Sequence, residues 1–191
     1  MKKLSIALVV GFLAAAGSAE ANGDGLALKI ALSQLNGASP IANVINWKIG
    51  EFQDLNMSLQ GMPLGTMHKE ATSEEGNGVW MTEAMSGGMI GNQTVEVLLD
   101  RADGHIIKMK QNGQEKAPPD DKIEIINQET ATITVPAGTF QTIHITAKSQ
   151  QSGNVEIWAN PQAITLDGTA KMTMQAQGMP VAMELTKFGG K

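Results

Sequence analysis

The stretch Thr134-Val135-Pro136-Ala137-Gly138-Thr139-Phe140, followed by Glu156-Ile157-Trp158-Ala159-Asn160-Pro161, decides the fold of this chain. Proline and glycine punctuate the region, and each run between them alternates apolar with polar residues. Alternation of this kind has the period of a β-strand with one covered face, and the punctuating residues mark turns. The last third of the chain therefore predicts consecutive antiparallel strands, ending in a hairpin of residues 171–176 and 181–187.

The same period of two extends back to Trp47. Leu55, Met57 and Leu59 alternate with polar residues, and a tight turn is predicted at Gly61-Met62-Pro63. Further strands are predicted over residues 66–73, 79–84, 94–99, 105–110, 123–129, 132–135, 141–149 and 154–158. The polar segment 116–121 contains two adjacent prolines and predicts a loop.

Helical spacing occurs only before the first strand. Asp24 can cap a helix that contains Leu28, Leu32 and Leu35 and stops at Gly37, and a second short helix is predicted over residues 40–46. The predicted fold class is therefore mainly β (α+β). Nine to eleven strands form one antiparallel sheet that curls into a half-barrel, with one or two N-terminal helices against its concave face.

The first 21 residues indicate the compartment. Lys2-Lys3 begin the chain, a short apolar run follows to Ala16, and Ala19-Glu20-Ala21 supplies the small residues of a cleavage site. This pattern predicts a signal peptide over residues 1–21, cleaved after Ala21, and a single periplasmic domain over residues 22–191. We expect no transmembrane segment after cleavage, because the apolar run is shorter than the roughly 20 residues that a spanning helix needs.

Composition excludes several functional classes. The chain contains no cysteine, which rules out disulfides, a thiolate nucleophile and a thiolate zinc site. Its net charge of −5 disfavours nucleic acid as a partner. No nucleophile elbow, phosphate loop or paired-histidine zinc motif occurs, and His68, His105 and His144 are far apart in sequence. We expect a monomeric protein that is not an enzyme and uses no cofactor.

Methionine is unusually frequent, with 12 residues against 4 Phe, 3 Trp and no Tyr. One explanation is packing, since the flexible thioether fills irregular gaps in a core. Another is a plastic apolar cavity for acyl chains. The strand residues predicted to line that cavity are Met57, Leu59, Trp80, Met172, Met174, Met183 and Leu185.

Two other functional classes remain open. Met62, Met67, His68 and Met81 offer thioether and imidazole ligands of the kind that Cu(I) prefers, provided that they converge in space. Alternatively, an exposed sheet edge can take up a strand from another protein, which makes the domain an envelope interaction module with a packed core.

Several turns carry a family resemblance. The turn Val135 to Phe140, the Ile157-Trp158 pair before Asn160-Pro161, and the patches Gly50-Glu51-Phe52 and Pro63-Leu64-Gly65-Thr66 resemble a family of uncharacterised bacterial periplasmic domains. That family is similar in fold to the lipoprotein carriers LolA and LolB. Its usual Pro-Xaa-Gly turn appears here as Leu166-Asp167-Gly168. The resemblance implies a periplasmic protein with the curled-sheet fold of those carriers. Together with the methionine-rich interior, it leads us to expect a binding protein that carries or senses an apolar ligand, lipid or lipoprotein acyl chains, in maintenance of the cell envelope.

Overall fold

The structure is a computed structural model that describes residues 45–87, 90–118, 123–149, 153–176 and 179–190. Everything described is strand, turn or loop. The strands are β1 Phe52–Leu59, β2 Met62–Glu75, β3 Gly78–Gly87, β4 Gly91–Asp100, β5 Ile106–Gln111, β6 Gln114–Lys116, β7 Ile123–Val135, β8 Gly138–Ser149, β9 Gly153–Ala159, β10 Thr169–Ala176 and β11 Met179–Gly189.

The N-terminal predictions lie mostly outside the described residues. This holds for the signal peptide, its cleavage site and the helix expected after Asp24. Of the second predicted helix, over residues 40–46, only Ile45 and Asn46 are described, and neither is helical. No helix that could span a membrane occurs in the described part of the chain.

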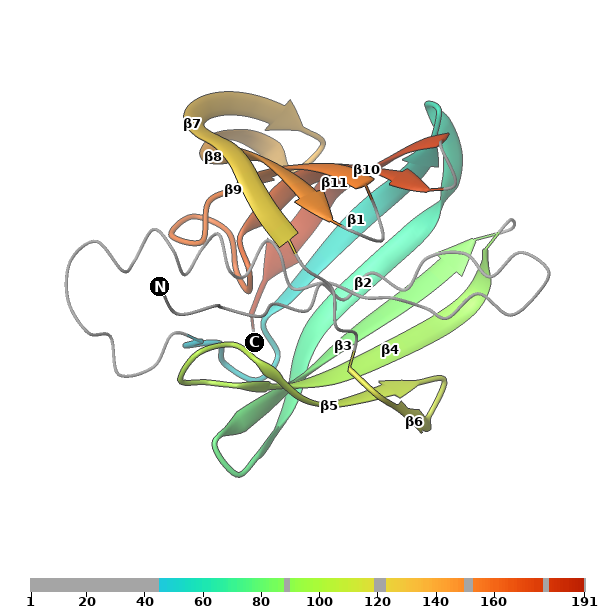
Figure 1. Ribbon diagram of the computed structural model, residues 1–191, viewed down its shortest axis with the longest axis vertical. Helices are drawn as coiled ribbons and strands as arrows, with labels where there is room; N and C mark the ends of the chain where they lie inside the picture. The colour runs from blue at the N-terminus through green and yellow to red at the C-terminus, as the bar shows by residue number, and fades with distance from the viewer. Residues whose placement is uncertain (1–44, 88–89, 119–122, 150–152, 177–178, 191) are drawn as a thin grey trace.

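All eleven strands form one antiparallel sheet, in the order β6-β5-β4-β3-β2-β1-β11-β10-β9-β8-β7. Strands adjacent in sequence pair with each other, except that β6 and β7 do not pair. β1 also pairs with β11 and so joins two meanders, β1 to β6 and β7 to β11, into one sheet. The predicted strand number and antiparallel pairing are confirmed. Figure 1 shows β1 and β2 running diagonally between the two halves, with β6 and β7 as the edge strands.

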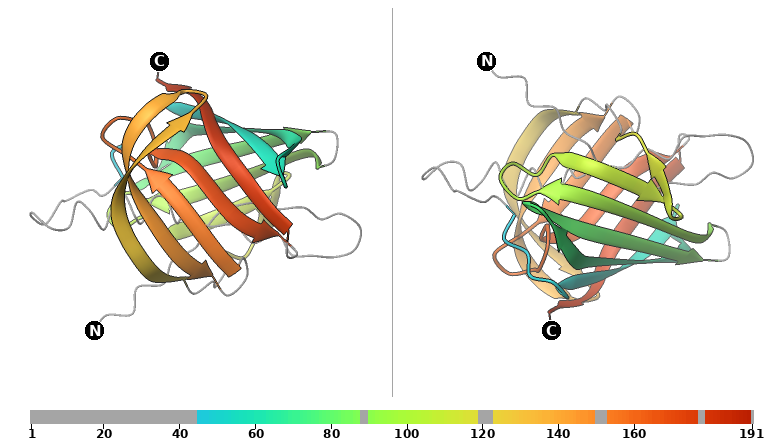
Figure 2. Two further views of the ribbon diagram at one scale, coloured as in Figure 1. Left: turned by 90° about the horizontal axis from the view of Figure 1, so that it is seen from above. Right: turned by 90° about the horizontal axis from the view of Figure 1, so that it is seen from below.

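The sheet curls until its two halves face each other. Figure 2 shows β8 to β11 on one side of the interior and β3 to β5 on the other. The turn between β7 and β8 reaches back to β11, where the amide N of Ala137 donates to the carbonyl O of Leu185 at 3.0 Å. Phe140 and Phe188 pack edge to face with ring centroids 5.9 Å apart. The predicted curled sheet is therefore confirmed, and β6 and β7 do not pair to close it.

The structure differs from the local predictions at three points. The turn between β1 and β2 lies at Gln60 and Gly61, both with positive φ, so Met62 and Pro63 already belong to β2. β7 is one strand of 13 residues where two were predicted, because Thr130 and Ala131 continue its ladder with β8. The three-residue strand β6 was not predicted, since so short and polar a segment shows no alternation.

The concave face of the sheet forms one apolar core that draws on both halves. The interior has two different ends. At the first, which we call the closed end, residues 160–168 between β9 and β10 fold over the sheet and bury Ile164 and Leu166. The segment before β1 is held at the same end by Arg101, whose Nη1 donates to the carbonyl oxygens of Ile45 and Trp47.

The opposite end, which we call the open end, lies where β1 and β10 end and where β2 and β11 begin. The amide N of Gln60 donates to the carbonyl O of Pro180 at 2.9 Å and ties the β1–β2 turn to the start of β11. Met62 and Met179 are exposed here, at 58% and 37% of their surface. One end of the half-barrel is thus covered by a folded loop, whereas the other presents apolar side chains to solvent.

Candidate functional site

Methionine side chains line one continuous part of the concave face. Met172 lies opposite Met183 across β10 and β11, and Met183 lies opposite Met57 across β11 and β1, so the three form a row. Met67 and Met85 form a further cross-strand pair on β2 and β3. All five side chains are at most 5% exposed. Directly opposite residues on a sheet are side-chain neighbours, so the thioethers make a contiguous lining.

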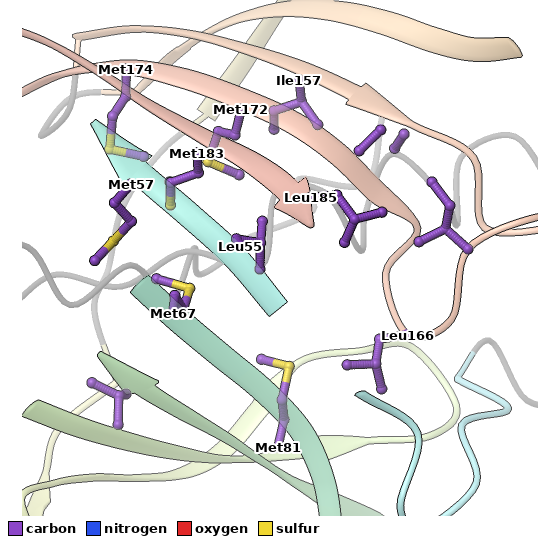
Figure 3. Close-up of a cluster of buried hydrophobic side chains, with 14 of the residues drawn as sticks. Leu55, Met57, Met67, Met81, Ile157, Leu166, Met172, Met174, Met183 and Leu185 are labelled. Atoms are coloured by element: carbon purple, nitrogen blue, oxygen red, sulfur yellow. The ribbon is translucent and has the colours of Figure 1, made fainter. Parts of the chain in front are cut away.

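Six of the seven residues predicted to line a cavity belong to this interior. Met57, Met172, Met174, Met183 and Leu185 are buried in the core, and Leu59 packs against it. Figure 3 shows Met57, Met172, Met174 and Met183 close together, with Met67 and Met81 directed toward them from β2 and β3. The methionine cluster, meaning Met57, Met67, Met85, Met172, Met174 and Met183, lies toward the open end.

Trp80 does not share this interior. On β3 the inward positions are Val79, Met81 and Glu83, and Trp80 alternates with them, which places it on the convex face. There its Nε1 donates to Glu75 at 3.0 Å, and the Nζ of Lys110 lies 4.5 Å from the ring centroid. Trp80 is only 8% exposed although it lies outside the core, because neighbouring side chains of the convex face, among them Glu75 and Lys110, cover it.

The four residues considered for a soft metal are separated. Met67 and Met81 point into the core, whereas His68 follows Met67 on the strand and so lies on the convex face, with its Nδ1 2.6 Å from Asp54 Oδ1. Met62 is exposed at the open end. The structure therefore buries Met67 and Met81 in the apolar core and leaves His68 and Met62 outside it.

Charged side chains, which were not predicted as site residues, are buried near the closed end. Lys69 on β2 and Glu83 on β3 are directly opposite each other, at 7% and 2% exposure. The Nζ of Lys69 forms a salt bridge with Asp167 from the 160–168 loop and lies 4.0 Å from Oε1 of Glu83. Gln53 on β1 donates from Nε2 to Asp167 at 3.1 Å and to the carbonyl O of Thr165 at 2.6 Å. We call Gln53, Lys69, Glu83 and Asp167 the polar cluster.

The protonation states within the polar cluster follow from burial and charge. Burial raises the pKa of the Glu83 carboxyl to about 8, and the negative charge of Asp167 adds to the effect while Lys69 opposes it. Burial would raise the pKa of Asp167, but the charge of Lys69 and hydrogen bonds from Lys69 and Thr169 outweigh it and lower that pKa. Burial would lower the pKa of Lys69, but the charges of Asp167 and Glu83 raise it. Near neutral pH the cluster is one ion pair beside a mostly protonated Glu83.

Some buried polar atoms lack a partner. Oε1 of Gln53, Oε2 of Glu83 and Oγ1 of Thr169 form no hydrogen bond within the described residues. A buried polar atom without a partner costs free energy. The sequence did contain a signal for this cluster: Lys69 has the inward phase of Met67 and Ala71, and Glu83 that of Met81 and Met85.

Gly168 sets the path of the loop that delivers Asp167. Its φ is +75°, and a Cβ at this position would lie 2.6 Å from the carbonyl carbon of Asn160 and would overlap Pro161.

We expect Gly168→Ala to lower the free energy of unfolding by about 2–4 kcal/mol, because the loop must shift and the ion pair of Asp167 weakens. Gly76→Ala is the matched control, since Gly76 also has positive φ but nothing within 4 Å of its Cβ position. It should cost about 1–2 kcal/mol. Equal losses in urea unfolding would contradict this role of Gly168.

The comparisons with known proteins give structural likeness alone. No protein-family model and no curated protein matches the chain. A protein with a YmcC-like fold from Bacteroides fragilis aligns with 78% of this chain and 100% of its own, at 12% identity and a TM-score of 0.48. MucB in complex with the periplasmic part of MucA aligns with 85% of this chain at 12% identity and a TM-score of 0.43. This chain spans 55% of the MucB chain.

Proposed function

We propose that the protein is a non-enzymatic periplasmic binding protein that carries or senses an apolar ligand, of the class of lipids or lipoprotein acyl chains. The observation that carries this proposal is the methionine cluster on the concave face of a curled sheet. Thioether side chains rotate easily and adapt to irregular apolar shapes, so they suit a site that must open around a flexible chain. The proposed ligand-binding residues are Met57, Leu59, Met172, Met174, Met183 and Leu185.

The two ends of the half-barrel support a direction of entry. The 160–168 loop and the polar cluster cover the closed end, whereas the methionine cluster lies toward the open end with Met62 and Met179 exposed at its rim. An acyl chain entering at the open end would run along the methionine cluster before it reached the polar cluster. Each buried methylene contributes about 0.8 kcal/mol, so a chain that fills this interior would gain substantial binding free energy.

The compartment and the family analogy come from the sequence. The charged, apolar and small-residue pattern of residues 1–21 supports export with cleavage after Ala21. The turns that resemble a domain family similar to LolA and LolB support a role in the cell envelope. One fold hosts many functions, so the methionine cluster has to be tested directly.

Native mass spectrometry of the protein purified gently from the periplasm of its own host tests the proposal first. We expect a reproducible added mass that disappears after organic extraction. A copper-sized adduct would favour the soft-metal alternative. A clean mass of the chain alone, together with no binding of an acyl probe such as cis-parinaric acid, would contradict an apolar ligand.

Substitutions at the open end should abolish acyl binding. In Met174→Asp with Met183→Asp, two carboxylates would occupy the proposed path of the chain, and we expect the fluorescence of cis-parinaric acid to show no saturable binding. Gln175→Asp is the matched control, since Gln175 is exposed on the other face of β10. Met174→Leu with Met183→Leu preserves apolar volume and should retain binding even if the double aspartate variant does not fold. Unchanged binding in a folded double aspartate variant would contradict the proposed path.

A second candidate function rests on the edge strand β7. This strand has 13 residues, and Ile125 and Ile126 expose 44% and 59% of their surface. A long edge strand with exposed apolar residues is suited to strand addition by another protein. An envelope interaction module would appear in the native mass spectrum as a protein complex instead of a small extractable mass.

A further inference from the structure

The convex face carries a depression of about 490 Å³ over β1 to β4. Its floor is the backbone of Leu55, Met67 and Met85, which are directly opposite one another and bury their side chains in the core. Side chains of two adjacent rows rise on either side of this floor. One row contains Asp54, His68, Ala84 and Thr94, and the other contains Thr66, Ser86 and Asn92. The surface involved is the outer side of the strands at the centre of Figure 1.

Small side chains produce the hollow. Ala84 stands between His68 and Thr94, where a larger residue would fill the space. Thr66 and Ser86 are opposite each other, and their hydroxyl oxygens lie 3.1 Å apart. The volume falls within the usual range of small-molecule sites, about 300–1,000 Å³.

The polar groups around the depression are partly held in place and partly free. Nδ1 of His68 lies 2.6 Å from Oδ1 of Asp54, and Nε2 lies 3.4 Å from Oε2 of Glu70. Phe52 stacks against the imidazole with ring centroids 5.8 Å apart, so the ring is fixed on both edges and one face. The carboxamide of Asn92 and the hydroxyl of Thr94 form no side-chain hydrogen bond within the described residues. The Asn92 carboxamide and the Thr94 hydroxyl are therefore available to a ligand beside a rigid His–carboxylate unit.

We infer that this depression is a second binding site, independent of the concave interior, for a neutral polyhydroxylated ligand such as a sugar ring. Hydroxyl groups both donate and accept, and so do the threonine, serine and asparagine side chains around the hollow, while Asp54 accepts. The methyl group of Ala84 offers an apolar patch for the C–H face of a sugar. The carboxylates of Asp54 and Glu70 disfavour phosphate and other anions.

Methyl NMR of the full exported chain tests the inference. Labelled Ala84 and Thr94 report on the depression, and the probes are N-acetylglucosamine, maltose and inorganic phosphate. We expect saturable shifts of both methyl groups at millimolar concentrations of at least one sugar, and none with phosphate. The absence of shifts with both sugars, or shifts caused by phosphate alone, would overturn the site.

Two substitutions place the binding in the depression. Ala84→Leu should weaken sugar binding at least about tenfold by filling the hollow, and Thr82→Leu is the matched control two residues earlier on the same face of β3. Asp54→Asn keeps the size of the side chain and should also weaken binding, which covers the case in which Ala84→Leu does not fold. The sugar would be shown to bind elsewhere if folded Asp54→Asn bound it as tightly as the unsubstituted protein does. Where Ala84→Leu also folds, its affinity would have to be unchanged as well.

Discussion

Lys69→Met should destabilise the protein strongly, with an expected loss of about 3–5 kcal/mol in the free energy of unfolding. Methionine has similar length and suits the surrounding core, so packing is nearly preserved. The loss comes from Asp167, a residue that is only 5% exposed. Its negative charge would remain buried after the cation of Lys69 has been removed. Urea unfolding followed by circular dichroism measures the change.

Two further variants separate the ion pair from general effects of substitution. Lys69→Met with Asp167→Asn removes both charges while the amide can still interact with Gln53 and Thr169, so we expect it to recover much of the loss. Lys171→Met breaks a salt bridge to Glu184 that spans 2.8 Å on the partly exposed convex face. It should cost less than about 1 kcal/mol. If Lys69→Met cost no more than Lys171→Met, the buried pair would not stabilise the closed end.

Glu83 should make the protein less stable as the pH rises from 5 to 8. Its pKa is about 8 in the folded protein against 4.5 as the ordinary value. The folded state therefore favours the neutral carboxyl, and the associated stability is complete below pH 4.5 and is lost as the pH rises through 8. The slope from one such group is at most about 1.4 kcal/mol per pH unit.

Glu83→Gln isolates this contribution, because glutamine resembles the protonated carboxyl and does not titrate. The stability of the substituted protein relative to the original should increase steadily between pH 5 and pH 8. Asp167 changes protonation at lower pH, because its pKa is lowered. Lys69 changes protonation above pH 10.5, because its pKa is raised from that value. Neither group therefore changes protonation between pH 5 and pH 8. A difference in unfolding free energy that does not vary with pH would contradict a protonated Glu83.

Most of the sheet could be predicted from local pattern. The alternation around Leu55, Met57 and Met174 placed their strands correctly and put their side chains on one face, because a strand repeats every two residues. Turn residues were informative where glycine takes a positive φ, as at Gly104 between β4 and β5. The pattern failed in β7, where polar residues on both sides of the strand concealed its continuity.

Alternation alone does not say which of the two faces of a strand is the inside. Trp80 was predicted to line the interior, whereas the structure gives the inward positions of β3 to Val79 and Met81. Lys69 and Glu83 also alternate in phase with buried residues, so the pattern places two charged side chains in the core. Burial of a charged side chain is unfavourable unless it has a partner. The partner, Asp167, is about a hundred residues away and lies on a loop.

The sequence by itself determined the antiparallel strands, their inward methionines and the absence of thiol chemistry, because these depend on residue type and on a period of two. Only the tertiary structure decided which strands meet and which end of the half-barrel is covered. It also decided that Gln53, Lys69, Glu83 and Asp167 form one buried cluster. These features depend on pairing β1 with β11 and on folding the 160–168 loop across the sheet. Alternation can place Lys69 and Glu83 on the inner face of their strands, but contacts between segments so far apart along the chain leave no local pattern that shows which residues meet.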